Sequence, residues 1–178
     1  HQIYALALGD GLLSVAAGNG REALLNDTLA ASELAQPSGL TFRDGRLTFA
    51  DSESSSIRQA DFAADRLTTL AGPAENTLFD FGDVDGPVGV SRLQHPLAVV
   101  WGDDGMLYVA DTYNSRIKVV DPATGAIRAL AGAGGTGGFR DGAFADAAFD
   151  EPGGLSAANG VLYVADTNNH AIRALDLG

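Results

Sequence analysis

The chain contains no cysteine, only one lysine (Lys118) and one tryptophan, and no long run of apolar residues. The absence of cysteine excludes disulfide bonds, thiolate metal sites and cysteine catalysis within this sequence. It leaves the compartment undetermined, and we slightly favour the cytoplasm. A membrane-spanning helix needs about eighteen consecutive apolar residues, which no stretch supplies. The first residues carry no initiator methionine and no basic or apolar leader, so we expect no signal peptide and interpret the chain as part of a longer protein.

Basic residues are also scarce, since 11 lysines and arginines stand against 23 aspartates and glutamates and the formal net charge is −12. A surface this negative repels the phosphates of nucleic acids and anionic lipids, so we expect neither as a partner. The hydrophobic content of 46% nevertheless predicts a folded globular domain. Most of the acidic residues are aspartates, which favour turns and therefore fit a β protein rich in loops.

Three nearly identical segments show that the chain is built from an internal repeat. They are Leu47–Ser52, Leu107–Thr112 and Leu162–Thr167. Each is preceded by a proline and followed by an isoleucine next to a basic residue. The isoleucines at positions 3, 57, 117 and 172 recur every 54 to 60 residues, so about three repeats fill the molecule.

Each repeat predicts four short strands separated by turns. In the clearest copy we expect strands at residues 96–101, 106–110, 116–120 and 126–130. Both alternating faces of these strands are apolar, so neighbouring sheets must cover both of them. Radially stacked four-stranded sheets supply that cover, and we therefore predict an all-β fold, a β-propeller. A β-sandwich is the alternative, but it would not explain the period.

The predicted blades are connected by three long insertions rich in glycine and aspartate, at residues 18–34, 72–93 and 132–149. Because long loops at one place in a repeat share one face, we expect all three insertions on the same face as the turns between second and third strands. Tight hairpins such as Asp44-Gly45 and Asn159-Gly160 should occupy the opposite face. One turn of helix is a weak alternative at residues 144–149. The predicted division is a partial blade 1–28, blades 29–88 and 89–143, and a partial blade 144–178.

The segment Ala165–Arg173 resembles the NHL repeat, named for its Asn-His-Leu signature, and Tyr108–Asn114 matches the core of that repeat equally well. The stretch from Leu130 to Pro152 is similar to the NHL propeller that follows a thioredoxin-like domain in one bacterial and animal family. This resemblance implies a six-bladed ring, of which about half is present here. It also implies that any redox chemistry belongs to a thioredoxin-like domain absent from this chain. The second copy departs from the pattern, since Ser54 and Ser55 replace the asparagine and histidine.

The repeated aspartates Asp51, Asp111 and Asp166 each end a predicted strand and precede a polar turn. We expect each carboxylate to accept backbone N–H bonds and to fix a blade corner. A ring of carboxylates around a central channel or cation is the alternative, but equal placement in every repeat favours the structural role. The same structural role is expected of three further turn residues: Asn114, Asn169 and His170.

The second insertion concentrates three carboxylates and two aromatic rings between Phe79 and Gly86. A calcium loop of the EF-hand type would need a glutamate at its twelfth position, which is missing. We therefore predict a plain loop with Phe79 and Phe81 packed onto a neighbouring blade, and no metal or cofactor. The three histidines do not converge as zinc ligands either. The candidate binding-face residues are Phe79, Asp80, Phe81, Asp83, Asp85, Tyr113, Arg140, Asp141 and Asn168.

These features favour a non-catalytic scaffold whose insertion face binds a protein or peptide partner. A metal-dependent lactonase- or lyase-like propeller hydrolase is the alternative, although the sequence contains no nucleophile elbow and no assembled triad. Three repeats cannot easily close a ring, and an open arc leaves two apolar blade faces in water. We therefore expect a homodimer that completes a six-bladed ring, or further blades in a longer chain.

Overall fold

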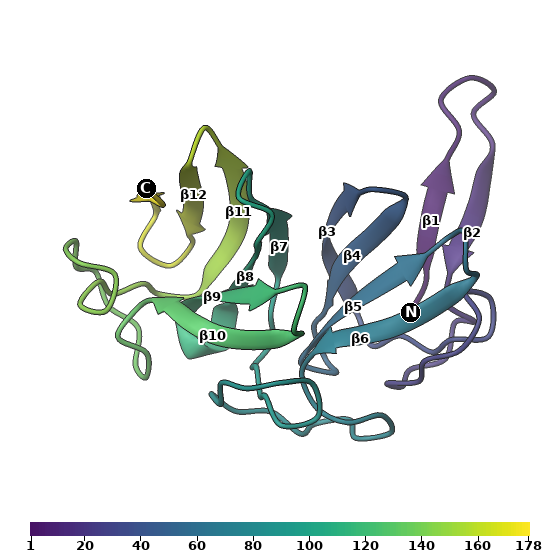
Figure 1. Ribbon diagram of the computed structural model, residues 1–178, viewed down its shortest axis with the longest axis horizontal. Helices are drawn as coiled ribbons and strands as arrows, with labels where there is room; N and C mark the ends of the chain where they lie inside the picture. Colours follow the sequence, from purple (N-terminus) through teal and green to yellow (C-terminus); the bar gives the residue numbers. More distant parts are fainter.

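The computed structural model describes all 178 residues and consists of four antiparallel β-sheets arranged side by side (Figure 1). Within each sheet, strands that follow one another along the chain are paired, which is the up-and-down order of a propeller blade. The first sheet contains β1 (Ile3–Leu6) and β2 (Leu13–Ala17). The second contains β3 (Pro37–Arg43), β4 (Arg46–Asp51), β5 (Ser56–Asp61) and β6 (Arg66–Ala71).

The remaining two sheets complete the repeat pattern. The third contains β7 (Ala98–Trp101), β8 (Leu107–Asp111), β9 (Arg116–Asp121) and β10 (Ala126–Ala131). The fourth contains β11 (Pro152–Ala158), β12 (Val161–Asp166) and β13 (Ala171–Asp176). The structure therefore confirms an all-β chain of propeller blades, two of them four-stranded, with a two-stranded and a three-stranded sheet at the ends.

Helical structure is limited to the single 3-10 turn η1 (Thr112–Asn114) between β8 and β9. The helical turn considered at residues 144–149 is present only as a single turn, and no helix continues from it. That segment forms only a turn, in which the N–H groups of Asp146 and Ala147 both donate to the Ala143 carbonyl. No helix in the structure has the length and apolar character needed to cross a membrane.

Three apolar clusters hold the blades together, and each lies between two adjacent sheets. The pleat of β8 shows how one strand serves two clusters, because successive side chains point to opposite faces. Leu107 and Val109 pack toward the second sheet, whereas Tyr108 and Ala110 pack toward the fourth. All four side chains are buried. The strand is therefore apolar on both faces because a neighbouring sheet packs against each of them.

Hydroxyl groups add a polar link between adjacent blades. Ser52, directly after β4, donates from Oγ to the carbonyl of Pro96 at 2.8 Å. Thr112, at the same place in the next repeat, donates from Oγ1 to the carbonyl of Pro152 at 2.9 Å. Thr167 is the third member of this series and is exposed, with no further blade beside it.

The two faces of the molecule differ as the repeat pattern predicts. The long insertions gather along the lower part of the molecule in Figure 1, beside the turns between second and third strands. The opposite face carries tight hairpins. Asp44 and Gly45 both have positive φ (51° and 78°), as do Asn159 and Gly160 (53° and 74°), which is the geometry of a type I′ turn. We call the first surface the insertion face and the second the hairpin face.

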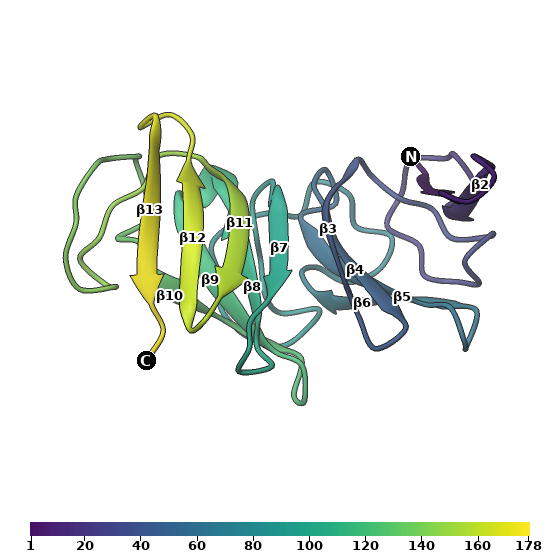
Figure 2. The same ribbon diagram turned by 90° about the horizontal axis from the view of Figure 1, so that it is seen from above.

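The sheets form an open arc, with β1–β2 at one end and β11–β13 at the other in both views (Figures 1 and 2). The β1–β2 hairpin carries exposed apolar side chains. Its exposed side chains are Tyr4, Leu6, Leu8, Leu12, Leu13 and Val15. At the other end Tyr163 and Ile172 are exposed. Each end therefore presents apolar side chains that a further blade would cover.

Position 132, directly after β10, requires glycine for two reasons. Its φ is +104°, and an added Cβ would lie 2.8 Å from the carbonyl oxygen of Ser115. We expect Gly132→Ala to lower the free energy of unfolding by about 2–3 kcal/mol, because positive φ and a backbone clash add. Gly135→Ala is the matched control, because φ is +79° there but nothing lies within 4 Å. Urea denaturation of both variants measures the difference, and equal losses would show that the clash contributes nothing.

Candidate functional site

The repeated aspartates are buried at the point where the second strand of each blade ends. Asp51 ends β4, Asp111 ends β8 and Asp166 ends β12, and each has a fully buried side chain. Their Oδ1 atoms accept backbone N–H bonds from the residue two before each repeat proline. These donors are Ala35, Gln94 and Asp150, at 2.8, 2.7 and 2.8 Å respectively. Each carboxylate thus joins the end of one strand to the loop that enters the blade.

The second oxygen of each aspartate faces a cation seven residues further along the chain. Asp166 Oδ2 accepts a hydrogen bond from Arg173 Nη1 at 2.8 Å and another from Asn169 Nδ2 at 2.9 Å. Arg173 also donates to the carbonyls of Ala148 and Arg140 in the preceding insertion. The pair therefore ties the insertion to the blade corner.

The second repeat builds this corner with different groups. Asn114 and Asn169 each donate to an insertion carbonyl, those of Gly82 and Gly138, but Ser54 is too short to do so. Ser54 instead donates to Asp51 and shares a hydrogen bond with Ser56. The insertion is held by Arg58, which donates from Nη2 to the Leu25 carbonyl at 2.7 Å and from Nη1 to the Glu33 carbonyl at 2.7 Å.

Burial shifts the pKa values of these corner groups. Loss of hydration raises the pKa of Asp51 and lowers that of Arg58, while the ion pair between them (2.9 Å) opposes both changes. Burial also raises the pKa of Asp111 to about 7, against the opposing effects of Lys118, Asn114 and the Gln94 N–H group. The nearby carboxylate of Asp83 adds to the increase.

The carboxylates of the second insertion face cations of β9. Lys118 Nζ lies 2.7 Å from Asp83, 3.3 Å from Asp85 and 3.6 Å from Asp111, and its side chain is fully buried. Arg116 Nε lies 2.8 Å from Asp83, and Asp80 pairs with Arg92 at 2.7 Å. An ammonium group therefore occupies the position between three carboxylates.

The remaining candidate residues make local contacts. Asp141 pairs with Arg173 Nε at 3.0 Å, and Arg140 donates from Nε to the Asp146 carbonyl. Asn168 donates to Asp150 at 3.3 Å. His170 is exposed and has positive φ (53°), and only its backbone N–H, which donates to the Thr167 carbonyl, is hydrogen-bonded within the turn. The structure gives its imidazole no partner.

The predicted packing of Phe79 and Phe81 onto a neighbouring blade is wrong. The two side chains are 64% and 54% exposed. They line a surface hollow of about 200 Å³ together with Tyr113, which is 49% exposed. Its other lining residues are Glu53, Ser55, Gln94 and His95. We call this site the aromatic hollow.

His95 and Tyr113 form one wall of the aromatic hollow. Their rings are stacked, with centroids 4.6 Å apart and planes 11° apart. The His95 Nε2 atom lies 3.1 Å from Glu53 Oε1, so the turn of the second sheet contributes a carboxylate to a wall built by the third. Sequence reasoning considered His95 only as a metal ligand and missed this arrangement.

The four ring-bearing positions of the aromatic hollow have counterparts in two other copies of the repeat, and none of those counterparts is aromatic. Backbone hydrogen bonds align Gly82 with Gly138 and Ala23. In each case the N–H group donates to the carbonyl of the last apolar residue of its insertion. The residues matching Phe79, Phe81, His95 and Tyr113 are then Gly20, Glu22, Gln36 and Glu53 in one copy and Gly135, Gly137, Glu151 and Asn168 in the other. The signal that sequence analysis could have used is this departure from the repeat. A structural role common to all blades does not account for aromatic residues that occur in one copy only.

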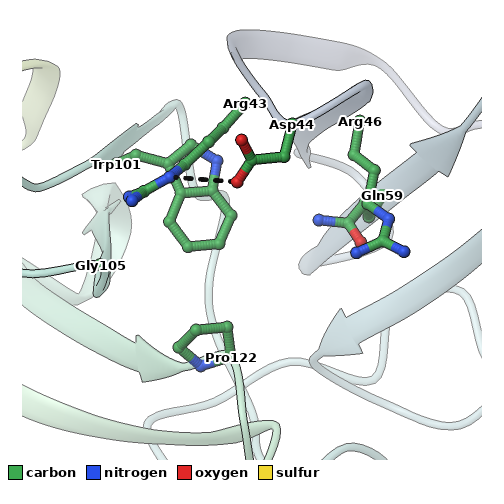
Figure 3. Close-up of a pocket in the computed structure, with 7 residues that line it drawn as sticks. All are labelled: Arg43, Asp44, Arg46, Gln59, Trp101, Gly105 and Pro122. Carbon is green, nitrogen blue, oxygen red and sulfur yellow. Dashed lines mark ion pairs between the residues drawn. The ribbon is translucent and has the colours of Figure 1, made fainter.

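The hairpin face carries a different hollow, of about 240 Å³, between the second and third sheets (Figure 3). Arg43 lies over the Trp101 ring at 5.4 Å from its centre and 3.6 Å from Asp44. Arg46 forms an ion pair with Asp61 at 2.8 Å. The cations of this hollow are therefore already paired with groups of the chain.

An aspartate, an asparagine three residues after it and a buried cation seven residues after it recur in two blades of the β-propeller, and this arrangement resembles that of NHL repeats. Residues 149–175 match the family model described as NHL repeat. The chain thus contains one matched NHL repeat and is homologous to NHL repeat-containing proteins.

Two curated relatives align with 99% of the chain. It is 45% identical over 185 residues to Protein SUPPRESSOR OF QUENCHING 1, chloroplastic, of Arabidopsis thaliana. It is 43% identical over 199 residues to NHL repeat-containing protein 2 of Homo sapiens. The chain spans 17% of the first relative and 27% of the second.

Solved structures share the fold at low sequence identity. A crystal structure described as an auxiliary nutrient binding protein from Bacteroides thetaiotaomicron matches with a TM-score of 0.72 and 19% identity, covering 97% of this chain and 42% of that one. Virginiamycin B lyase from Staphylococcus aureus matches with a TM-score of 0.54 and 14% identity, covering 98% and 48%. These likenesses show the fold alone.

The raised pKa of Asp111 predicts a specific pH dependence of stability. Between an ordinary aspartate pKa near 3.8 and the folded value of about 7, the folded chain holds a proton that the unfolded chain has lost. The free energy of unfolding should therefore fall as pH rises through this range. Between about pH 5 and pH 8 we expect wild type to lose about 2 kcal/mol relative to Asp111→Asn, as measured by urea denaturation.

Asp103→Asn is the control for this measurement, because Asp103 is exposed. Its stability curve should run parallel to that of wild type. If the Asp111→Asn curve also ran parallel to wild type, Lys118 would be holding Asp111 ionised and the burial argument would be wrong.

Proposed function

We propose that this chain is a non-catalytic propeller scaffold whose insertion face binds a protein or peptide partner. The observation that carries the proposal is the aromatic hollow. Phe79, Phe81 and Tyr113 remain about half exposed, although aromatic side chains are otherwise the strongest contributors to buried cores and interfaces. A cluster of exposed aromatic rings at one of three equivalent positions supports binding rather than folding.

The binding face extends beyond the aromatic hollow in this proposal. Asp80, Asp141 and Asn168 border the same face from the second and third insertions and from the last turn, and they supply a polar rim. An apolar centre with a polar rim is the usual anatomy of a protein interface. The net charge of −12 further favours a partner with basic residues over nucleic acid or an anionic membrane.

The alternative of a metal-dependent lactonase- or lyase-like propeller receives less support. The carboxylates that would hold a metal, Asp83 and Asp85, surround the ammonium group of Lys118. No group of three or more histidine, aspartate or glutamate side chains is arranged as a metal site. The likeness to virginiamycin B lyase concerns the fold and transfers no chemistry.

Selection from a random peptide library displayed on phage tests the proposal. We expect selected peptides to bind the wild-type chain and to lose at least tenfold in affinity on the double variant Phe81→Ser, Tyr113→Ala, since aromatic side chains dominate interface energies. Arg43→Ala on the hairpin face is the matched control and should bind these peptides normally. Binding is measured by isothermal titration calorimetry with synthetic peptides.

The outcomes of this selection separate the possibilities. If peptides bound more weakly to Arg43→Ala but not to the double variant, the binding surface would lie on the hairpin face and not on the insertion face. A library that yields no specific peptide would contradict the scaffold proposal.

We propose further that a second copy of the chain covers the open ends of the arc. The exposed apolar side chains of β1–β2, among them Leu6 and Leu13, and the exposed Thr167 hydroxyl support a further blade contact at each end. Further blades of a longer chain would satisfy the same surfaces, and the greater length of the relatives favours that arrangement for the whole protein.

For the chain itself we expect a dimer of about twice 18.2 kDa. Light scattering coupled to gel filtration measures the mass. Leu6→Ser, Leu13→Ser should shift the population toward monomer, because both side chains are exposed on the β1–β2 hairpin. A monodisperse wild-type monomer that remains folded would overturn the dimer.

A further inference from the structure

Three aromatic rings elsewhere in this molecule lie beside the chain's own arginines. The guanidinium carbon of Arg43 lies 5.4 Å from the centre of the Trp101 ring. That of Arg173 lies 4.7 Å from the centre of the Phe139 ring and 5.1 Å from that of Phe149. These distances fall within the range in which a cation is attracted to the face of an aromatic ring.

The aromatic hollow differs because no cation of the chain enters it. Its lining contains no lysine or arginine, although it contains two phenylalanines and the stacked rings of His95 and Tyr113. Two arginines that pair with the second insertion are engaged by its carboxylates. Arg92 pairs with Asp80, and Arg116 pairs with Asp83. The hollow thus presents aromatic rings without the arginine that lies beside Trp101, Phe139 and Phe149.

A carboxylate forms part of the same wall. Glu53 Oε1 accepts a hydrogen bond from Gln36 Nε2 at 3.1 Å and lies 3.1 Å from His95 Nε2. These two contacts fix the carboxylate, and its other oxygen, Oε2, makes no hydrogen bond within the chain. A positioned carboxylate beside aromatic faces attracts a cation and accepts its N–H donors.

The size of the hollow limits what can enter it. A volume of about 200 Å³ accommodates the head group and part of the stem of one long side chain, but not a folded domain or a sugar chain. The site is open at the surface, since its aromatic side chains are about half exposed. A side chain that projects from a partner therefore fits better than a free metabolite, which would need enclosure.

We propose that the aromatic hollow binds the cationic side chain of an arginine or lysine residue presented by a protein partner. This inference rests on the proposed function in taking the partner to be a protein. The cation lies against the stacked His95 and Tyr113 rings, with Phe79 and Phe81 beside its apolar stem and Glu53 Oε2 accepting an N–H bond. The net charge of −12 increases the rate at which a basic partner encounters this face.

The test uses short peptides that differ only in charge. Acetylated, amidated tripeptides Gly-Arg-Gly and Gly-citrulline-Gly have nearly the same shape, but citrulline is neutral. Each is titrated into the isotopically labelled chain at a fixed pH of about 8, and chemical shifts of the Tyr113 and His95 rings are followed. We expect the arginine peptide to bind at least fivefold more tightly than the citrulline peptide and to shift these rings first.

Three variants identify the groups responsible. Glu53→Gln should weaken binding of the arginine peptide about threefold or more and leave the citrulline peptide unaffected. Tyr113→Leu should weaken arginine binding while retaining an apolar wall. Phe139→Leu is the matched control, because Phe139 is also an exposed aromatic residue but already lies beside Arg173, and it should bind both peptides as wild type does.

The results distinguish this inference from the proposed function. Equal affinity for the two tripeptides, or no shift of the hollow's rings at high millimolar peptide, would overturn the cation site. If library peptides still bound the insertion face through an apolar side chain, the proposed scaffold function would be retained and only the proposed cation site would be wrong. If library peptides bound elsewhere while the arginine tripeptide bound the hollow, the cation site would stand without the proposed insertion-face scaffold.

Discussion

The blade corner depends on one buried carboxylate and the cation opposite it. Asp166 shows the arrangement in full, with a backbone N–H on one oxygen and an asparagine and Arg173 on the other. Burial of both charges is costly, and only a complete set of hydrogen bonds compensates for it. Removing one partner would therefore leave the other unpaired in the interior. The same few atoms fix the end of a strand, the entry of the next blade and the base of an insertion.

The corner cations also bind carboxylates of the insertions, and this decides which of those carboxylates remain available for binding. Asp83 and Asp85, which look like the start of a cation site, are engaged by Lys118. Phe79, Phe81 and Tyr113 have no comparable structural partner and stay exposed. A scaffold that is rigid at its corners can hold such side chains in fixed positions, which lowers the entropy that binding must overcome. The repeat supplies the frame, and departures from the repeat supply the candidate site.

The sequence predicted much of the fold because both of its signals are local. Alternating apolar residues determine strands, and a period of 54 to 60 residues with strand-by-strand correspondence is typical of blades. The four strands of the clearest repeat were placed within two residues of their observed bounds. Prediction failed for Phe79 and Phe81, since an aromatic residue in a loop carries no local information about whether a neighbouring surface will cover it.

The sequence by itself determined the class of fold, the repeat and the positions of the corner aspartates, because these follow from patterning and from residue types that turns require. The tertiary structure alone decided which groups meet. Glu53, His95 and Tyr113 come from turns and loops of two different sheets, and only the stacking of the blades brings them within contact distance. The partner of each aspartate, a cation seven residues away, was likewise visible as a repeated residue but not as an ion pair. Distance along a chain does not reveal proximity in space when each blade packs against both neighbours.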